Sequence, residues 1–244
     1  MSRALHQAGV EILQVISRDI RKAEELAGPI QAEPLSTPAQ INIIPDLFLV
    51  CVSDDALGKV LQDYTQFDAL VAHTSGSTGM EVFGSAYTRY GVFYPLQTFT
   101  RGREMAYGDI PFLVEGSATG VTKQITNLAS RISGTVEVTT SAMRRQIHIA
   151  AVFACNFSNH LSAIAADILA SEGLDLELLK PLQTETFRKL QHMHPIEAQT
   201  GPAVRQDNRI IHAHLNALSD RPEDAELYRA LTDSIIRFTR KKDE

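Results

Sequence analysis

Strand-like and helix-like segments alternate through the first part of the chain, and this alternation stops near Thr139. Before that point, short apolar segments followed by helical patterns predict strands joined by helices. After it, only helical patterns remain. A chain that alternates strands and helices folds around a doubly wound, parallel sheet. We therefore predict an α/β domain over residues 1–139 and an all-α domain over residues 140–244.

The expected strands lie within six apolar segments, "VEILQVIS", "DLFLVCVS", "ALVAHTSG", "GVFYPLQ", "PFLVEG" and "GTVEVT". "DLFLVCVS" is apolar without interruption, which is typical of a strand that is buried on both faces. The helix after it begins with Asp54 and Asp55, and carboxylates at a helix start interact favourably with the helix dipole.

The second part of the chain opens with the segment from Ser141 to Glu172, which contains neither Gly nor Pro. It predicts one helix of about 30 residues, longer than most helices in soluble proteins. A helix of this length is often shared across an interface between domains or between subunits. Three further helical segments follow, "DLELLKPLQTETFRKLQHM", "DNRIIHAHLNALSD" and "PEDAELYRALTDSIIRFTRKK".

Composition narrows the class of protein. The formal net charge is −6, whereas nucleic-acid-binding domains usually carry a basic excess, so we expect no nucleic-acid partner. No uninterrupted apolar run approaches the roughly 18 residues that span a bilayer, so we expect no membrane partner. Cys51 and Cys155 lie in apolar patterns, which favours buried, reduced thiols over a disulfide. Reduced thiols are typical of cytoplasmic proteins, so we expect a cytoplasmic location.

The motif that usually opens a dinucleotide-binding fold is missing from the sequence. That fold begins with a strand and a glycine-rich turn, G-x-G-x-x-G, into its first helix. Here "SRALHQAG" has the pattern of that first helix, and no G-x-G-x-x-G occurs in the 244 residues. Either the fold is a different one, or the first strand and its phosphate loop are absent. The order of the elements after Val10 favours the second interpretation.

Several segments, taken in order, resemble one family: "HTSGS", "VFYPLQTF", "IPFLVEG", "AAVFACNFSNHL", "KPLQTETFRKL" and "AQTGPAVRQD". They are similar to the Rossmann-like proteins with a C-terminal domain of unknown function. These are distant relatives of pyrroline-5-carboxylate reductase, ketopantoate reductase and deazaflavin-dependent NADP oxidoreductases. The resemblance implies NADP as cofactor and a helical domain of the 6-phosphogluconate-dehydrogenase C-terminal type. It also implies a homodimer and a site for a small-molecule substrate in a cleft between the domains.

The predicted cofactor-binding residues follow the strands, because ligands of open α/β sheets bind beyond the carboxyl ends of the strands. A hydroxyl and an arginine after the first expected strand suit the 2′-phosphate of NADP, and the alternative for Arg18 is a solvated helix start. Asp54 is a candidate for cofactor contact or for a helix N-cap, and His73 for cofactor contact or for a buried structural histidine. The complete set is Ser17, Arg18, Ser53, Asp54, His73, Thr74, Ser75, Gly76 and Pro95.

The long helix holds the predicted catalytic residues. Asn156 and His160 are four residues apart and would share one face of an α-helix, with Asn159 beside it and His148 two turns earlier. The resemblance implies a lysine or asparagine at this place, and no lysine occurs between Lys123 and Lys180. His160 or His148 would then donate the proton and Asn156 would orient the substrate. The alternative is that these side chains bond neighbouring helices or a dimer partner.

The predicted substrate-binding residues centre on "EAQTGPAVRQD", a polar loop between two helical patterns. In it, Arg205 is suited to hold a carboxylate or phosphate, and Gln199 and Thr200 to orient a carbonyl. The alternative is a rigid connector in which Asp207 caps the next helix. Asn159 and Gln97 complete the predicted substrate set.

We expect no metal site, because the histidines of "HMH" and "HAH" would point to different faces of a helix. The sequence thus predicts an NADP-dependent oxidoreductase that reduces a ketone or imine of a small, anionic substrate. The alternatives are a non-catalytic nucleotide-binding or regulatory protein, and an inactive, truncated relative.

Overall fold

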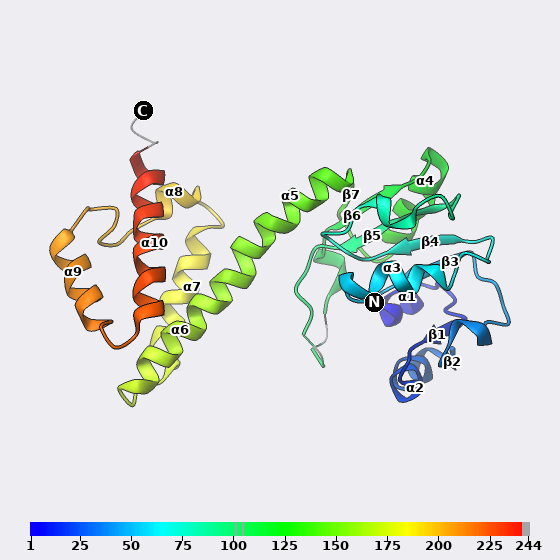
Figure 1. The fold of residues 1–244 in the computed structure, drawn as a ribbon, viewed down its shortest axis with the longest axis horizontal. Helices are drawn as coiled ribbons and strands as arrows, with labels where there is room; N and C mark the ends of the chain where they lie inside the picture. The colour runs from blue at the N-terminus through cyan, green and yellow to red at the C-terminus, as the bar shows by residue number, and fades with distance from the viewer. Residues whose placement is uncertain (101, 104, 241–244) are drawn as a thin grey trace. The chain divides into compact units, whose positions relative to one another are not determined.

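Two sheets form the framework of the first unit of the protein. The computed structural model describes residues 1–100, 102–103 and 105–240, and the chain divides into two units, Met1–Asn156 and a second unit that begins at Phe157 (Figure 1). In the first unit, a two-stranded parallel sheet joins β1 (Gln14–Ile16) to β2 (Glu33–Leu35). A separate five-stranded sheet has the order β3-β4-β5-β6-β7.

The five-stranded sheet is parallel except at one ladder. Its strands are β3 (Leu47–Val50), β4 (Leu70–His73), β5 (Tyr90–Pro95), β6 (Phe112–Gly116) and β7 (Val136–Val138). Strands β3, β4 and β5 run parallel, β6 is antiparallel to β5, and β7 is parallel to β6. Only the short 3-10 helix Tyr107–Asp109 appears in the described part of the β5–β6 connection. A parallel crossover normally needs a helix, and this connection returns as an antiparallel neighbour instead.

The helices of the first unit follow the predicted order. They are α1 (Ser2–Gln7), α2 (Ile20–Ala27), α3 (Asp54–Gln62) and α4 (Thr119–Ala129). The predicted α/β class is therefore confirmed, and each of the six expected segments contains a strand. Strand β2 was not predicted, because its three residues include Pro34 and lack an apolar run. Strand β3 alternates between half-buried and buried residues, so the predicted burial on both faces was wrong for this edge strand.

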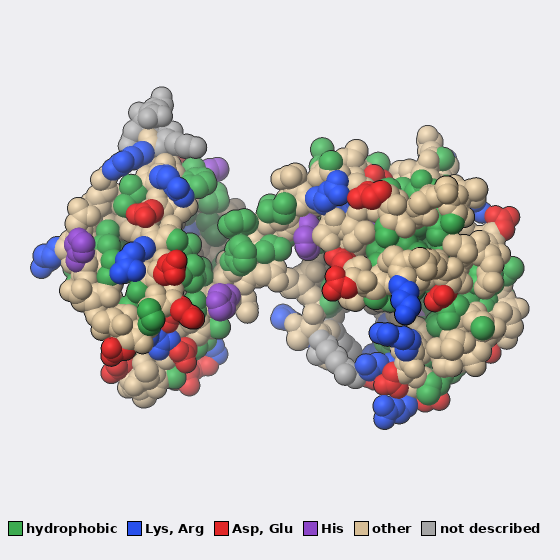
Figure 2. Space-filling view, viewed as in Figure 1, with side chains coloured by type: hydrophobic (Ala, Val, Ile, Leu, Met, Phe, Trp, Pro, Cys, Tyr) green, Lys and Arg blue, Asp and Glu red, His purple; other side chains and the backbone are tan. Residues whose placement is uncertain are grey.

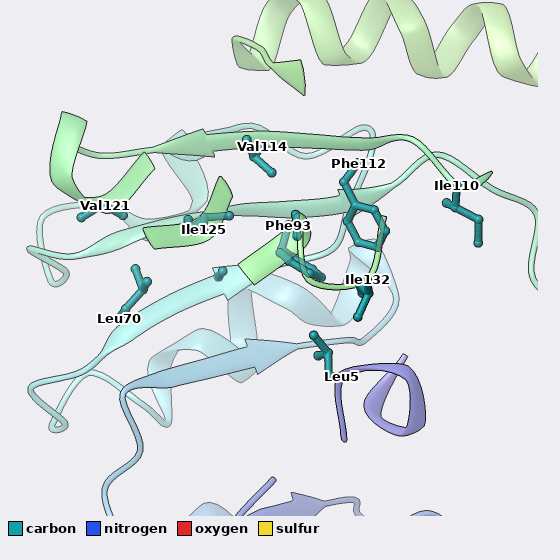
Figure 3. Packing of buried hydrophobic residues seen from close by; sticks show 11 residues of the cluster. Leu5, Leu70, Phe93, Ile110, Phe112, Val114, Val121, Ile125 and Ile132 are labelled. Carbon is teal, nitrogen blue, oxygen red and sulfur yellow. The ribbon is translucent and has the colours of Figure 1, made fainter. Parts of the chain in front are cut away.

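The main core lies between the five-stranded sheet and the helices α1 and α4 (Figure 3). It is formed by Leu5, Leu70, Ala72, Phe93, Ile110, Phe112, Val114, Val121, Ile125, Ala129 and Ile132, all of them buried. A second buried cluster, centred on Phe48, Leu57, Leu61 and Phe83, packs α3 against β3 and β4. Together the two clusters fix the sheet, and with it the loops that leave the strand ends.

One continuous helix leads from the first unit into the second, as the sequence predicts. It runs from Ser141 to Ser171 and consists of α5 (Ser141–Ala151), a π-helical segment (Val152–Phe157) and α6 (Ser158–Ser171). The π-helical segment was not predicted. Pi-helical turns are rare, occur mostly inside α-helices and are frequent at functional sites.

The second unit is helical. After α6 it contains α7 (Lys180–Lys189), α8 (Pro195–Ala198), α9 (Asn208–Ala217) and α10 (Pro222–Arg240). Arg221 joins two of these helices, because it contacts the carboxylate of Asp167 on α6 and lies 2.7 Å from Asp224 on α10. Within the described residues, no strand occurs after β7.

Apolar side chains are exposed along the long helix and on the second unit (Figure 2). Leu178 and Leu182 are each 64% exposed. By length and composition, the helix Ser141–Ser171 could cross a membrane, although one such helix is weak evidence. Polar residues interrupt the apolar run within this helix, and the expectation of no membrane partner stays a prediction.

Candidate functional site

The parallel strands β3, β4 and β5 place their carboxyl ends at one edge of the sheet, together with the loops that follow them. Asp54 begins the helix after β3, and the loop Thr74–Thr78 follows β4. The two are joined, because the hydroxyl of Ser77 donates to the carboxylate of Asp54. The N-cap of α3 is Ser53, so the alternative role of Asp54 as the N-cap was wrong. Both Ser53 and Asp54 are exposed at this edge.

Ser75 shapes the loop after β4. Its side chain is buried, and its hydroxyl accepts hydrogen bonds from the backbone amides of Ser77, at 3.2 Å, and Thr78, at 2.9 Å. The hydroxyl of Ser75 is thus engaged in holding the turn. Thr74 is only half-buried and follows the strand directly, which leaves it the more accessible hydroxyl of the pair.

His73 is fully buried and has the structural role that the sequence left open. Its Nδ1 accepts a hydrogen bond from the amide of Ser75 at 3.1 Å, and its ring stacks on Phe83. Burial, followed by the charge of Arg144, lowers the pKa of His73 to about 4. The Gly79 carbonyl lies near the ring, yet no hydrogen bond of ordinary geometry reaches Nε2 within the described residues. The neutral ring is therefore the native form.

A tyrosine and a histidine meet beside Gly76. The hydroxyl of Tyr94, at the end of β5, lies 3.1 Å from Nδ1 of His148 on α5. A Cβ atom on Gly76 would stand 2.6 Å from Cζ of Tyr94 and 2.7 Å from Nδ1 of His148. Only glycine fits at this position without displacing the pair. Tyr94 was not among the predicted site residues, although it precedes Pro95, which is also buried.

A buried arginine holds α5 against the sheet edge. The Arg144 side chain is fully buried; it donates to Oε2 of Glu115 at 2.5 Å and to the carbonyl of Thr78 at 2.7 Å. Ser141 donates to the same carboxylate at 2.8 Å and accepts from the amide of Met80 at 3.0 Å. This network was not predicted from the sequence. The signals were a carboxylate that ends the apolar strand β6 and an arginine facing inward one helical turn before His148.

The end of β1 presents the residues predicted to bind the 2′-phosphate. Arg18 is exposed, and the amide of Ser17 donates to the carbonyl of Leu35 on β2. The next residue, Asp19, caps α2 by accepting from the amide of Arg21 at 3.2 Å, and its carboxylate also pairs with the Arg21 side chain. Ser36, directly after β2, adds a hydroxyl beside this end of the sheet, and the sequence analysis did not select it.

Of the polar residues predicted for the site on the long helix, Asn156, Asn159 and His160 are exposed and His148 is half-buried. Asn156 lies in the π-helical segment, and Asn159 and His160 lie on α6. Because a π turn holds more residues than an α turn, the four-residue spacing of Asn156 and His160 is not that of a regular α-helix. His148 is the one of these four that has a side-chain partner at the sheet edge.

The polar loop from Glu197 lies in the second unit. Arg205 is exposed, and Gln199 donates to the carbonyl of Thr200 at 3.0 Å. Asp207 caps α9 by accepting from the amide of Ile210 at 3.1 Å, so this part of the alternative interpretation is confirmed. On the nearby helix α7, Glu185 lies 4.0 Å from Arg188.

Gln97, in the loop after β5, is exposed and turned toward its own neighbour. Its side-chain oxygen accepts from the amide of Thr98 at 2.8 Å, which leaves its amino group for a ligand. Cys51 and Cys155 are free. The predicted burial was wrong for Cys155, whereas burial raises the pKa of the Cys51 thiol beside Thr74 although the residue as a whole is exposed. In the parts of the chain that the structure describes, no group of three or more His, Cys, Asp or Glu side chains is arranged to hold a metal ion.

The fit of a dinucleotide is uneven across these residues. The hydroxyls and the arginine at the end of β1 suit a 2′-phosphate, and the edge from Asp54 to Gly76 suits a ribose and an amide. In the order of the dinucleotide fold, the strand with the glycine turn lies between the strands that correspond to β1 and β3. Here β1 pairs with β2 and β3 with β4, and no ladder joins β1 to β3 in the described residues.

Solved structures of other proteins share this fold. A protein from Bacteroides fragilis, described as a "putative NADP oxidoreductase", is 39% identical, has a TM-score of 0.90, and matches over 97% of this chain and 92% of its own. The imine reductase from Myxococcus stipitatus in complex with NADP+ is 16% identical, with a TM-score of 0.59 and coverage of 99% and 90%. Pyrroline-5-carboxylate reductase from Streptococcus pyogenes is 11% identical, with a TM-score of 0.56 and coverage of 97% and 95%. At these lower identities the likeness concerns the fold alone.

No curated protein matches the sequence. A family model described as a domain of unknown function, DUF2520, matches residues 110–235, which include β6, β7 and most of the helical unit. The resemblance predicted from the motifs is confirmed: the chain belongs to the DUF2520 family of Rossmann-like proteins.

Proposed function

We propose that the chain is an NADP-dependent oxidoreductase that reduces the C=O or C=N bond of a small, anionic substrate. The observation that supports it best is the polar set at the carboxyl edge of the sheet. It consists of Asp54 on α3, Thr74 and Gly76 in the loop after β4, Tyr94 on β5 and His148 on α5, all within one unit. The 39% identity to the Bacteroides fragilis protein supports the same reaction class.

The cofactor residues of the proposal are those at the strand ends. Ser17 and Arg18 hold the 2′-phosphate, Ser53 and Asp54 the ribose, and the backbone at Gly76 approaches the nicotinamide side. Thr74, Ser75 and Pro95 complete this edge. His73 is a buried structural residue that holds the loop through the amide of Ser75. When bound, NADPH supplies the hydride, and the protein contributes position and a proton.

The substrate residues of the proposal come from α5, the π-helical segment and the second unit. His148 or His160 donates the proton, and Asn156 orients the reacting group. Arg205 neutralises the anionic group of the substrate, and Gln199, Thr200, Asn159 and Gln97 donate or accept hydrogen bonds around it. In this proposal these residues meet in a cleft between the two units.

The proposal includes a homodimer in the cytoplasm. Exposed large hydrophobic side chains on the second unit, Leu178, Leu182, Phe187 and Leu190 among them, favour burial against a second copy of the chain.

A non-catalytic nucleotide-binding protein is the second candidate. G-x-G-x-x-G, whose backbone amides normally hold the pyrophosphate, does not occur in the 244 residues.

Titration calorimetry with NADPH and NADH tests the proposal on this chain and on a form extended at its N-terminus by a strand and glycine turn. We expect both forms to prefer NADPH and the extended form to bind it more tightly. Arg18→Ala should weaken binding of NADPH but not of NADH, and Arg3→Ala, a change at another exposed arginine, should alter neither. Binding of neither nucleotide by either form would contradict the proposal and leave the sheet edge for another ligand.

The reaction itself is tested by measuring the rate of NADPH oxidation with a panel of small carboxylic acids that carry a ketone or an imine. NADPH binding without oxidation of NADPH across the panel would favour the non-catalytic alternative.

A further inference from the structure

The contact between Tyr94 and His148 joins two elements that are far apart in the sequence. The Tyr94 hydroxyl and Nδ1 of His148 are 3.1 Å apart, and the two rings meet edge to face, at 72° with their centroids 6.1 Å apart. Tyr94 is 9% exposed, whereas His148 is only half-buried. The pair therefore has a buried end, at the phenol, and a more accessible end, at the imidazole.

Two features hold this pair in place. Gly76 lies over the hydrogen bond so closely that a Cβ atom there would come within 2.8 Å of the Tyr94 hydroxyl. Arg144, four residues before His148 on α5, is fixed by Glu115 and by the carbonyl of Thr78. Residues four apart lie on the same face of a helix, so the buried arginine sets the orientation in which α5 presents His148.

The surroundings of Tyr94 decide which group carries the proton. Burial, followed by the charge of Asp54, raises the pKa of Tyr94, and the positive charge of Arg144 only partly opposes this. The phenol is therefore protonated at neutral pH and can donate to Nδ1. A neutral imidazole that accepts at Nδ1 carries its own proton on Nε2.

The geometry of the His148 imidazole determines where its Nε2 proton points. The two ring nitrogens lie on different edges of the imidazole, so an Nε2–H group points away from Tyr94 and toward the less buried side. Within the described residues, no hydrogen bond to Nε2 of His148 competes for it. Nε2–H is thus available to a ligand at the carboxyl edge of the sheet.

We propose that Tyr94 is a positioning residue that holds His148 in the Nε2–H tautomer and makes Nε2 the proton donor of the site. This inference rests on the proposed function and narrows it, because it selects His148 over His160. In the step, the substrate heteroatom that has gained the electron pair of the C=O or C=N bond takes the proton from Nε2. Nδ1 takes the phenol proton as Nε2 gives up its own. Once the product has left, Nδ1 returns this proton to the tyrosinate and Nε2 takes one from water, which restores the Nε2–H tautomer. The charge of Arg144 favours that transient phenolate.

The tautomer can be measured without any substrate, from the ring nitrogen shifts of protein labelled with 15N-histidine. His148→Gln assigns the signals. We expect wild-type protein at pH 8 to show a protonated Nε2 and an unprotonated Nδ1, and Tyr94→Phe to show both tautomers. Tyr87→Phe is the matched control, because Tyr87 is also 9% exposed and hydrogen-bonded, to the carbonyl of Leu61. An Nδ1–H tautomer in the wild type, or an unchanged spectrum in Tyr94→Phe, would overturn the proposal.

Kinetics give a second readout, with NADPH and 1-pyrroline-2-carboxylate as probe. Tyr94→Phe should lower kcat about 10- to 100-fold, as expected for weakened general acid catalysis, with NADPH affinity unchanged by calorimetry. His148→Gln should lower kcat at least as much, whereas Tyr87→Phe should keep it. If Tyr94→Phe lowered kcat no more than Tyr87→Phe does, the positioning role of Tyr94 would be contradicted. If the wild type oxidises no NADPH, the proposed reaction fails, and the nitrogen shifts still decide the tautomer.

Discussion

The guanidinium of Arg144 lies 2.5 Å from the carboxylate of Glu115, and the arginine is fully buried while the glutamate is 18% exposed. This ion pair joins the first turn of α5 to the end of β6. Removing one partner of such a pair leaves a buried charge without compensation, which costs more than the pair itself contributes.

Glu115→Gln should therefore lower the free energy of unfolding by about 3 kcal/mol, measured by urea denaturation. The matched control is the neighbouring arginine. Arg145 lies 3.2 Å from Glu81, with side chains 46% and 69% exposed. Arg145→Gln should cost less than about 1 kcal/mol, because exposed ion pairs are screened by solvent. Equal effects of the two substitutions would contradict the structural role of Arg144.

Gly76→Ala should destabilise the protein by about 1–3 kcal/mol, the usual cost of forcing an extra methyl group into a packed site. The new methyl would overlap Tyr94 and His148, so the 15N signals of His148 should change as well. Gly120→Ala is the control, because a Cβ atom at this position of α4 meets nothing within 4 Å. That substitution should leave the stability unchanged or raise it by up to about 1 kcal/mol. A neutral Gly76→Ala would contradict the close packing.

Acid should destabilise the protein through His73. Its pKa is about 4 in the folded state and 6.5 in the reference state, so the unfolded chain binds the proton first as the pH falls. The stability that His73 contributes is complete above pH 6.5, declines as the pH falls toward 4, and is lost below 4. The expected loss is about 3 kcal/mol.

The measurement compares urea denaturation of wild type and His73→Gln at several pH values. The difference between the two proteins should change by this amount across the window, whereas His212→Gln, at an exposed histidine, should follow the wild type. A constant difference between wild type and His73→Gln would show that His73 titrates normally in the fold.

A charge on the exposed apolar surface of the second unit should weaken the proposed homodimer. Leu182→Lys places an ammonium group at a leucine that is 64% exposed in the single chain. Sedimentation at micromolar concentration should show a dimer for the wild type and a shift toward monomer for this variant. Thr184→Lys adds the same charge two residues away and should keep the dimer. A monomeric wild type would contradict the proposal.

The order of elements could be predicted from the sequence because it depends on local patterns. Apolar runs located β3, β4, β5 and β6, and the absence of Gly and Pro located the long helix. The antiparallel pairing of β6 with β5 could not be predicted, because it depends on the path of a connection rather than on the strand residues. The π-helical segment also escaped prediction, since its sequence is as helical as its surroundings.

The site was predicted in part, for a similar reason. Residues next to strand ends, such as Asp54 and Gly76, were found because topology alone brings them to one edge. Tyr94 and Arg144 were missed, because their roles arise from contacts with residues more than 25 positions away. The roles of His160, Asn159 and Arg205 stay predictions, since they depend on how the second unit meets the first.

The division of the sheet affects how the protein meets other chains. One continuous sheet has two edge strands, whereas two separate sheets give the described fold the edges β1, β2, β3 and β7. Each free edge carries backbone amides and carbonyls that an extended segment of another molecule can pair with. Amides on the open sides of β1 and β3 should exchange hydrogen with water faster than those inside the β4–β5 ladder. Within the described residues, these edges are the places where an extended segment can add to a sheet by backbone hydrogen bonds.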